Sequence, residues 1–437
     1  MIRKEIKRIS KIGKALVTVE GNPGVALNHV VELLNADTGQ SISLAKAINI
    51  TEETTTFQVY NGTQGLSTQT RIRMHEAPMS IGFSETMLGR SFDGVGNVTD
   101  NGPGIIYTRQ LSTQLDTLNP TVRLVPKQPM WTGVPMIDVF NTLVKSQKIP
   151  IFAGPNEPYN RLLSQIAKGA QVDVIIFAGI GLKYDEYQYF RDELSASGNM
   201  DKTIMFTHLA GEPQIKGLML PDAALSVARE FADSGRDVLV LLTDMTNWSN
   251  ILRNVANYQD MIPSLQGYPG SLYSELARRY EVAADIEGAG SITIIGATTL
   301  ESLEDPVPDN TGYITEGQFF LEGGKLKLAR SLSRLKQQAN SDTRSDHRPI
   351  MTAMASLLAD GEKAYEAAEV GAANDAFSQK LLRYRSDFIN SIEEPFGTPL
   401  SLEDALDMCW DLLRKHFEPE ETGISGKIIE EYWEKKR

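Results

Sequence analysis

The pattern of apolar and polar residues changes twice along the chain. Up to about Met74 it consists of short β-type runs that turn residues interrupt, such as KALVTVEG and TTTFQVYNGTQGL. Short runs with frequent turns are typical of a small antiparallel sheet or barrel. We therefore predict an N-terminal β-barrel over residues 1–75.

Between about Val134 and Gln318, strand-like apolar runs alternate with helical segments. The strand-like runs are IPIFA, VDVIIFAG, TIMFTH, DVLVLLT and SITIIGA. One helical segment, PDAALSVAREFADSG, has Pro221 near its predicted start and Gly235 just past its end. This alternation predicts a mostly parallel sheet with helices on both faces. Such sheets bind ligands beyond the carboxyl ends of their strands.

Beyond about Ser345 the strand pattern ends and helical patterns take over. In SLEDALDMCWDLLRKHF, Ser401 and Asp404 are typical of a helix N-terminus, and an apolar stripe follows at helical spacing: Leu402, Leu406, Cys409 and Leu413. Because Cys409 lies on this stripe, we interpret it as core packing and not as a nucleophile. We predict an α/β domain over residues 76–344 and a helical bundle over 345–437.

Composition and charge narrow the classes of function. The 437 residues include 43 Lys and Arg against 56 Asp and Glu, and the net charge of −13 argues against a nucleic-acid groove and against direct binding to anionic lipid. No apolar stretch approaches the roughly 20 residues that cross a bilayer, and MIRKEIKRISK lacks the apolar part of a signal peptide. A single cysteine and scattered histidines indicate no intrinsic metal site. We expect a cytoplasmic protein without direct membrane insertion, linked to any membrane through partner proteins.

The segment KIPIFAGPNEPYNRLLSQIAKGA, Lys148 to Ala170, has the strand, turn and helix pattern of a phosphate-binding corner, but it lacks the residues that bind phosphate and magnesium. A short strand leads to a turn at Gly154–Pro155, and a helix follows. A working phosphate loop closes with Gly-Lys-Ser or Gly-Lys-Thr, because the lysine neutralises phosphate and the hydroxyl holds magnesium. Pro158, Tyr159 and Asn160 occupy that region instead. The sequence therefore predicts a degenerate phosphate loop on a nucleotide-binding scaffold.

Other polar residues have structural interpretations. Asp244 ends the run DVLVLLTD, where a phosphate-loop enzyme keeps a carboxylate for magnesium, but without the upstream lysine a helix cap or turn is favoured. Asp93 precedes Gly94 and Gly96, and turn geometry explains both glycines. For Arg334, composition alone favours a surface salt bridge.

A set of ordered segments resembles one known family. The segments are NGTQGL, SETMLGRSFDGVGNVTDNGP, VLLTDMTNWSNILR, GYPGSLYSELARRYE, PDNTGYITEGQ and SLSRL. Together they closely resemble the B subunit of the V-type and archaeal A-type rotary ATPases, from the N-terminal domain into the helical C-terminus. The resemblance implies a β-barrel, a P-loop-NTPase-like α/β domain and a helical bundle. It also implies a non-catalytic, regulatory subunit that alternates with catalytic A subunits in an A3B3 ring around a central stalk.

In that family the A subunit holds most of the ATP or ADP with its Mg²⁺, and the ring couples ATP hydrolysis or synthesis to proton or sodium transport. The B subunit supplies an arginine finger, which falls within SLSRL and carries over to Arg334. A guanidinium suits this role because it stays charged and forks across phosphate oxygens in the transition state. Tyr313 matches a family position near the interface. The implied partners are the A subunit, the central-stalk rotor and the peripheral-stalk subunits.

The sequence departs from the family pattern in two segments, and two other functions remain as alternatives to that of a B subunit. Relatives have a basic GRRGYPG where this chain reads SLQGYPG, so the loop from Ser264 to Gln266, which is thought to face the rotor, has lost charge. The segment FFLEGGKLKLAR before SLSRL is short, so we expect local differences around Arg334.

One alternative is a self-sufficient nucleoside triphosphatase with an unorthodox phosphate site around Gly154. The other is an unrelated metabolic α/β enzyme, for which the sequence offers no convergent acid and base groups.

Overall fold

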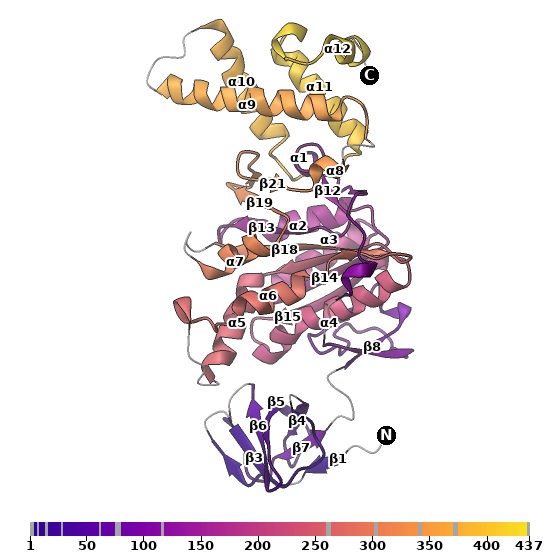
Figure 1. The fold of residues 1–437 in the computed structure, drawn as a ribbon, viewed down its shortest axis with the longest axis vertical. Coiled ribbons are helices and arrows are strands. Elements are labelled where there is room, and N and C mark those ends of the chain that lie inside the picture. Colours follow the sequence, from indigo (N-terminus) through magenta and orange to yellow (C-terminus); the bar gives the residue numbers. More distant parts are fainter. Residues whose placement is uncertain are drawn as a thin grey trace.

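Three regions follow one another along the long axis of the molecule (Figure 1). The computed structural model describes residues 4–6, 8–13, 16–27, 29–60, 63–74, 80–114, 118–258, 264–300, 305–339, 343–369 and 375–434. An antiparallel sheet lies at one end, a parallel sheet with helices in the middle, and a group of helices at the other end (Figure 1). The order of the three regions agrees with the order predicted from the sequence.

The N-terminal region is a curled antiparallel sheet. Its strands are β1 (Lys4–Ile6), β2 (Lys11–Ile12), β3 (Leu16–Glu20), β4 (Val30–Leu34), β5 (Ser41–Ile50), β6 (Thr54–Val59) and β7 (Arg71–Met74). They lie in the order β1-β7-β4-β5-β6-β3-β2, and no ladder joins β1 to β2 among the described residues. In β6 the side chains of Thr55, Phe57 and Val59 are buried and alternate with half-buried ones, which is the period of a sheet with one core face. A closed barrel stays a prediction, and the predicted boundary after residue 75 lies outside the described residues.

The central region is built on a mostly parallel sheet. Its main path runs β20 (Lys325–Leu326), β19 (Gly317–Glu322), β13 (Lys148–Ala153), β18 (Ser291–Thr299), β16 (Val238–Thr243), β14 (Val174–Leu182), β15 (Thr203–Leu209) and β9 (Ser91–Phe92). All neighbours along this path are parallel except β19 and β20. Two short antiparallel strands, β17 (Ala284–Asp285) and β21 (Leu332–Ser333), pair with β18 and β19. The predicted parallel sheet is confirmed.

Helices cover both faces of this sheet. One face carries α2 (Tyr159–Gly169) and α3 (Tyr184–Ala196), and the other carries α4 (Gln214–Asp233), α5 (Met245–Tyr258), α6 (Leu272–Tyr280) and α7 (Pro306–Ile314). Successive residues of β14 point to opposite cores: Ile175 packs in the cluster that includes Leu163, and Ile176 packs in the cluster that includes Leu220. Burial on both faces explains why these strands are apolar throughout and do not alternate with polar residues.

Helix α4 begins earlier than predicted. The sequence placed Pro221 near the helix start, but the helix begins at Gln214 and Pro221 lies inside it. Proline removes one N–H from a helix interior. The residues before Pro221 still form helix because Ile215 is buried and Leu220 packs in the core cluster on this face of the sheet. Packing therefore overrides the local boundary signal.

The remaining elements connect these regions and form the helical end. The connecting elements are β8 (Ser80–Phe83) paired with β10 (Arg109–Ser112), β11 (Pro129–Met130) paired with β12 (Leu143–Val144), α1 (Pro135–Asp138) and α8 (Lys336–Ala339). The helical end contains α9 (His347–Glu369), α10 (Ala376–Ser391), α11 (Leu402–His416) and α12 (Gly426–Tyr432). Ser401 caps α11 by accepting the Asp404 N–H at 3.1 Å, and Cys409 is buried, so both predictions are confirmed.

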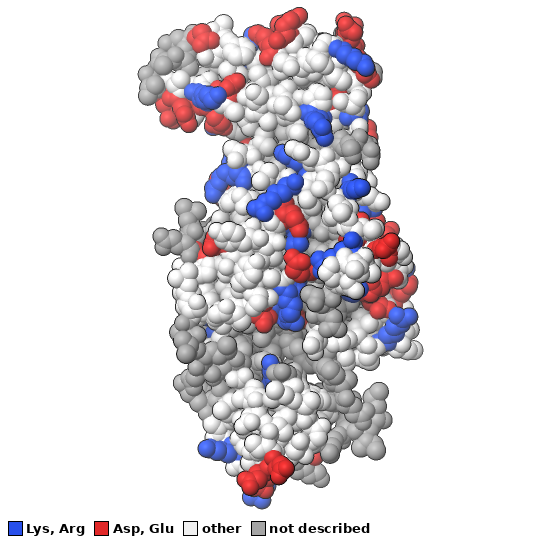
Figure 2. All heavy atoms as spheres, viewed as in Figure 1, with Lys and Arg blue, Asp and Glu red and all other residues white. Residues whose placement is uncertain are grey.

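Surface charge is mixed on the face drawn in Figure 2. Acidic and basic side chains are interspersed over the central region, and acidic ones gather over the C-terminal helices. This distribution agrees with the net charge of −13. Within the described ranges, no helix combines the length and apolar character that a bilayer crossing requires.

Candidate functional site

The phosphate-binding corner has the predicted scaffold. Strand β13 ends at Ala153, a turn follows, and α2 begins at Tyr159. The turn uses its own backbone donors: the Glu157 N–H bonds to the Gly154 carbonyl at 3.0 Å, and the Tyr159 N–H bonds to the Glu157 carbonyl at 2.9 Å. Two N–H groups of the turn are therefore engaged within it, and Pro155 and Pro158 supply none.

Glu157 places a carboxylate in this corner. Its two oxygens accept the N–H groups of Gly323 and Gly324, each at 2.8 Å, from the turn between β19 and β20. Both glycines have positive φ angles, 58° and 71°, a conformation that glycine adopts without strain. The loop is thus tied to its neighbour by a negative side chain, which repels phosphate.

Asn160 takes its position in the first turn of α2. Its side-chain oxygen accepts the Thr243 hydroxyl at 2.8 Å, and its amide nitrogen donates to Glu186 at 3.1 Å. Burial raises the pKa of the neighbouring Tyr159 hydroxyl, and the carboxylates of Asp244 and Glu186 raise it further. A neutral amide and a protonated phenol fill the region where a phosphate loop carries its lysine. The residues of this corner therefore do not fit the phosphates of ATP.

Asp244 is a buried helix cap. One carboxylate oxygen accepts the Thr246 N–H at 2.8 Å near the start of α5, and the other accepts the Thr299 hydroxyl at 3.0 Å. The predicted capping role is confirmed. Burial raises the pKa of Asp244 to about 6, because the charged form loses its hydration.

The raised pKa of Asp244 predicts a pH-dependent stability. An acid whose pKa is higher in the folded state than in the unfolded state lowers the free energy of unfolding as pH rises from about 4 to about 6. Asp244→Asn keeps the acceptor for the Thr246 N–H, and its amide can donate to the Thr299 hydroxyl. We expect the variant to match the natural chain at pH 4 and to exceed its free energy of unfolding by up to about 3 kcal/mol at pH 7.5. Urea unfolding at both pH values measures this difference.

A control with the opposite sign is available at Asp100. Arg90 donates to Asp100 at 2.7 and 2.8 Å, and these bonds lower the pKa of Asp100 to about 2. Asp100→Asn should therefore destabilise the chain at pH 7.5 and have a smaller effect towards pH 2. Equal pH profiles for the natural chain and Asp244→Asn would contradict the assignment of a raised pKa to Asp244.

Arg334 lies on the surface at the other end of the sheet. It follows β21, and its N–H bonds to the Glu316 carbonyl at 3.0 Å, just before β19. The guanidinium is exposed and donates to the Thr315 carbonyl at 3.2 Å. Among the described residues no carboxylate pairs with Arg334, so the surface salt bridge that composition favours is not found in that part of the chain.

A close backbone approach fixes the position of Arg334. Gly317 lies opposite Ser333 in the β19–β21 pair and has a φ angle of 137°. A Cβ atom at Gly317 would lie 2.1 Å from the Leu332 carbonyl oxygen, so only glycine fits there. The segment that carries Arg334 therefore lies directly against β19.

Tyr313 lies on the same part of the surface. It belongs to the last turn of α7 and is 75% exposed, and Thr315, which Arg334 contacts, caps this helix. No hydrogen bond joins Tyr313 to Arg334 among the described residues. The two residues that the resemblance singled out are thus brought to one region of the surface through Thr315.

Arg334 and the phosphate corner lie at opposite ends of β13. Glu316, which holds the Arg334 backbone, bonds to the Lys148 carbonyl at the start of this strand, whereas the corner begins after Ala153 at its end. A six-residue strand spans roughly 20 Å. Arg334 is therefore too distant to serve the loop of its own chain.

The loop from Ser264 to Gln266 and the possible metal ligands complete the description of the predicted site residues. In the loop that departs from the family pattern, Ser264 and Leu265 line a hollow of about 470 Å³ together with residues of α6 and α7, and Leu265 is 67% exposed. Within the described ranges, His, Cys, Asp and Glu side chains form no group of three or more that could hold a metal ion.

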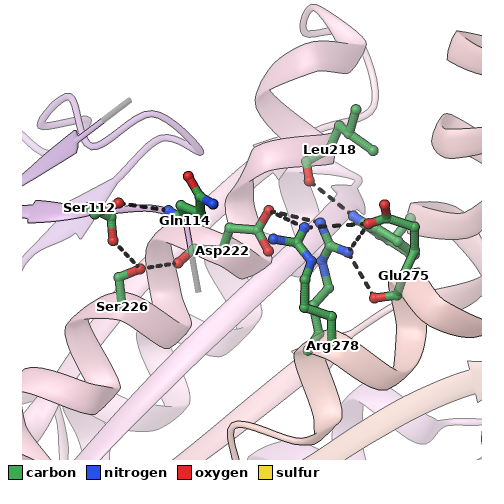
Figure 3. Close-up of polar contacts among 9 residues, drawn as sticks. Ser112, Gln114, Leu218, Asp222, Ser226, Glu275 and Arg278 are labelled. Carbon is green, nitrogen blue, oxygen red and sulfur yellow. Dashed lines mark hydrogen bonds and ion pairs between the residues drawn. The ribbon is translucent and has the colours of Figure 1, made fainter. Parts of the chain in front are cut away.

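A buried ion-pair cluster lies between α4 and α6, and the sequence analysis did not predict it (Figure 3). Arg279 donates to Asp222 and to Glu275, both at 2.8 Å, and its guanidinium lies 4.2 Å from the centre of the Trp248 ring. Arg278 reaches Asp222 at 3.3 Å. Burial raises the pKa of Asp222, and Arg279 and Arg278 oppose that shift. The only local signal was the Arg-Arg pair within SLYSELARRYE, which lies 57 residues from Asp222.

Comparison with known proteins identifies relatives along the whole chain. Residues 133–329 match the family described as the ATP synthase alpha/beta family, nucleotide-binding domain. The V-type ATP synthase beta chain of Borreliella afzelii (strain PKo) is 44% identical over 437 residues, which cover 100% of this chain and 99% of the relative. That of Borrelia turicatae (strain 91E135) is 46% identical over 408 residues, covering 93% and 94%. That of Treponema denticola is 42% identical over 434 residues, covering 99% of both chains.

Proposed function

Because this chain belongs to the family of V-type ATP synthase beta chains, the B subunits of V-type ATPases, we propose that it is a non-catalytic subunit that completes the ATP site of a neighbouring A subunit. Family membership excludes the unrelated metabolic enzyme. It makes the chain part of a multisubunit rotary complex whose nucleotide-binding domain handles ATP. The alternation with A subunits in an A3B3 ring belongs to the proposal.

The observation that carries the proposal is the position of Arg334. An exposed guanidinium without a carboxylate partner among the described residues is free to meet an anion from outside the chain. It lies at the opposite end of β13 from the degenerate loop, so its ligand belongs to another subunit. A guanidinium at such an interface binds phosphate oxygens in a fork and stabilises the charge of the transition state. Tyr313 lines the same interface in this proposal.

The degenerate loop explains why, in this proposal, the neighbouring A subunit and not this chain carries out ATP hydrolysis. The region from Gly154 to Asn160 has no lysine, uses the Glu157 and Tyr159 N–H groups within the turn, and holds the Glu157 carboxylate. In the proposed ring, the A subunit supplies the lysine, the Mg²⁺ hydroxyl and most of the ATP contacts, and Arg334 acts in trans. Hydrolysis or synthesis is then coupled to proton or sodium transport through the central-stalk rotor, with peripheral-stalk subunits as further partners.

The proposal also covers the domain limits of the chain and its location in the cell. We propose a barrel over residues 1–75, a P-loop-NTPase-like domain over 76–344 and a helical domain over 345–437. The last strand of the N-terminal sheet ends at Met74 and α9 begins at His347, which supports these limits. We propose that the chain lies on the cytoplasmic face of the membrane, held there by the complex.

The isolated chain should bind ATP weakly and hydrolyse none. A phosphate loop without its cation loses a charge-assisted partner of the β- and γ-phosphates. Titration calorimetry with Mg²⁺ and ATP tests binding, and ATPase assays of the chain alone and with its A subunit test turnover. Turnover should appear only in the mixture, which should co-purify as one complex.

The alternative predicts the opposite pattern. A self-sufficient nucleoside triphosphatase would bind Mg²⁺–ATP tightly as an isolated chain, and Asn160→Ala would abolish that binding. Tight binding that survives this substitution would place the nucleotide elsewhere in the chain, and it would contradict both the proposal and this alternative.

A further inference from the structure

We propose that Gln147 is a positioning residue, which holds Arg334 in the geometry that its action on the neighbouring nucleotide requires. The inference rests on the proposed function of Arg334. Gln147 is fully buried and directly precedes β13. It bonds to Glu316, just before β19, and to Ser333 of β21, and these two strands lie on the edge of the sheet toward the C-terminal helices (Figure 1).

The side-chain amide of Gln147 bonds to both anchors of Arg334. Its nitrogen donates to the Glu316 carbonyl at 2.9 Å and to the Ser333 hydroxyl at 3.0 Å. The same Glu316 carbonyl accepts the Arg334 N–H at 3.0 Å, and Ser333 directly precedes Arg334. The Gln147 amide thus joins Glu316, which bonds to the Arg334 backbone, to Ser333, which directly precedes Arg334.

The orientation of this amide is fixed from its other side. The Gln147 side-chain oxygen accepts the Val144 N–H at 3.1 Å, so the nitrogen must face Glu316 and Ser333. The Ser333 hydroxyl, also buried, donates in turn to the Thr142 carbonyl at 3.1 Å. Removing the Gln147 side-chain amide would therefore leave the buried Val144 N–H without this acceptor, and it would take one hydrogen bond each from the Glu316 carbonyl and the Ser333 hydroxyl.

The segment that carries Arg334 is also restrained by its backbone pairing with β19. Strand β21 contains only Leu332 and Ser333, and Arg334 itself is exposed. A second tether, the ion pair of Lys148 with Glu316, fixes Glu316, and the Lys148 N–H bonds to the same carboxylate at 2.9 Å. That tether does not reach Ser333, whereas Gln147 does. Gln147 is therefore a buried side chain that ties Ser333, directly before Arg334, to Glu316 at the start of β19.

A displaced guanidinium loses much of its effect on a transition state. A misplacement of about 1 Å can cost on the order of 10²-fold in rate, because the stabilising charge acts only at the right distance. Gln147→Met keeps the length and burial of the side chain but removes both donated hydrogen bonds. We expect turnover of the assembled ATPase ring to fall by roughly 10- to 100-fold, with little change in KM for Mg²⁺–ATP.

A double-mutant cycle with Arg334→Ala separates positioning from general structural support. If Gln147 acts through Arg334, Gln147→Met should lower turnover by less than about twofold in rings that already carry Arg334→Ala. Gln165→Met is the matched control, because Gln165 is a buried glutamine that donates to the Gly397 carbonyl at 2.7 Å, away from Arg334. It should leave turnover unchanged in both backgrounds. Ser333→Ala, which removes the other partner of the bridge, repeats the cycle if Gln147→Met rings do not assemble.

Each result of the cycle supports or overturns a named statement. A loss confined to rings with an intact Arg334 supports the inference. Equal losses with and without Arg334, or normal turnover of the single variant, overturn the role of Gln147 and leave the proposed function standing. Normal turnover of the Arg334→Ala ring overturns the proposed function itself, and the inference with it.

Discussion

Rings that carry Arg334→Ala should turn over ATP more slowly than natural rings by a factor on the order of 10³ to 10⁵. The guanidinium has no carboxylate partner among the described residues and lies far from the loop of its own chain, so in the proposed ring its removal should act on the transition state at the interface. Steady-state ATPase assays on rings of matched composition measure the loss. Nucleotide affinity, measured separately, and ring assembly should change much less, because the finger acts mainly in the transition state.

Two further variants sharpen this prediction. Arg334→Lys keeps the charge but loses the planar fork, so only part of the turnover should return. Arg229→Ala is the control, because Arg229 lies on α4 and pairs with Asp233 at 2.7 Å on the surface. It should leave turnover unchanged. Near-normal turnover of the Arg334→Ala ring would make Arg334 a structural arginine.

Replacement of Arg279 should have the largest effect on stability. Arg279→Met would leave Asp222 buried without its nearest cation, and breaking a buried ion pair from one side costs about 3 to 5 kcal/mol in the free energy of unfolding. Loss of the contact with the Trp248 ring adds to this cost. Urea unfolding at pH 7, followed by the fluorescence of the buried tryptophans Trp248 and Trp410, measures the difference.

The neighbouring arginine provides a matched control. The Arg278 side chain is 36% exposed and reaches Asp222 only at 3.3 Å, so Arg278→Met should cost less than about 1 kcal/mol. A double variant, Arg279→Met with Asp222→Leu, should recover part of the stability, because neither charge is then left unpaired. Equal losses for Arg278→Met and Arg279→Met would contradict the assignment of Arg279 as the main partner of Asp222.

The sequence alone determined the elements whose signals are local. Strands such as β14 and β16 are buried on both faces, so their apolar runs could be recognised without a partner. The cap of α11 at Ser401 and the missing lysine after Gly154 also depend only on nearby residues. The order of the three regions, the parallel sheet and the degenerate corner therefore followed from the sequence. The choice of Arg334 followed from resemblance and not from composition, which favoured a salt bridge.

Tertiary structure alone decided the contacts between distant residues. Gln147 meets Glu316 across 169 positions and Ser333 across 186, and no local pattern encodes either pairing. The start of α4 before Pro221 likewise depends on packing against the sheet, which outweighs the proline signal. The physical reason is that periodicity reports which face of an element is buried, but not which side chain it meets. Hydrogen-bond partners and ion pairs are chosen when the folded sheet brings remote segments together, and the surroundings of Arg334 are decided at that step.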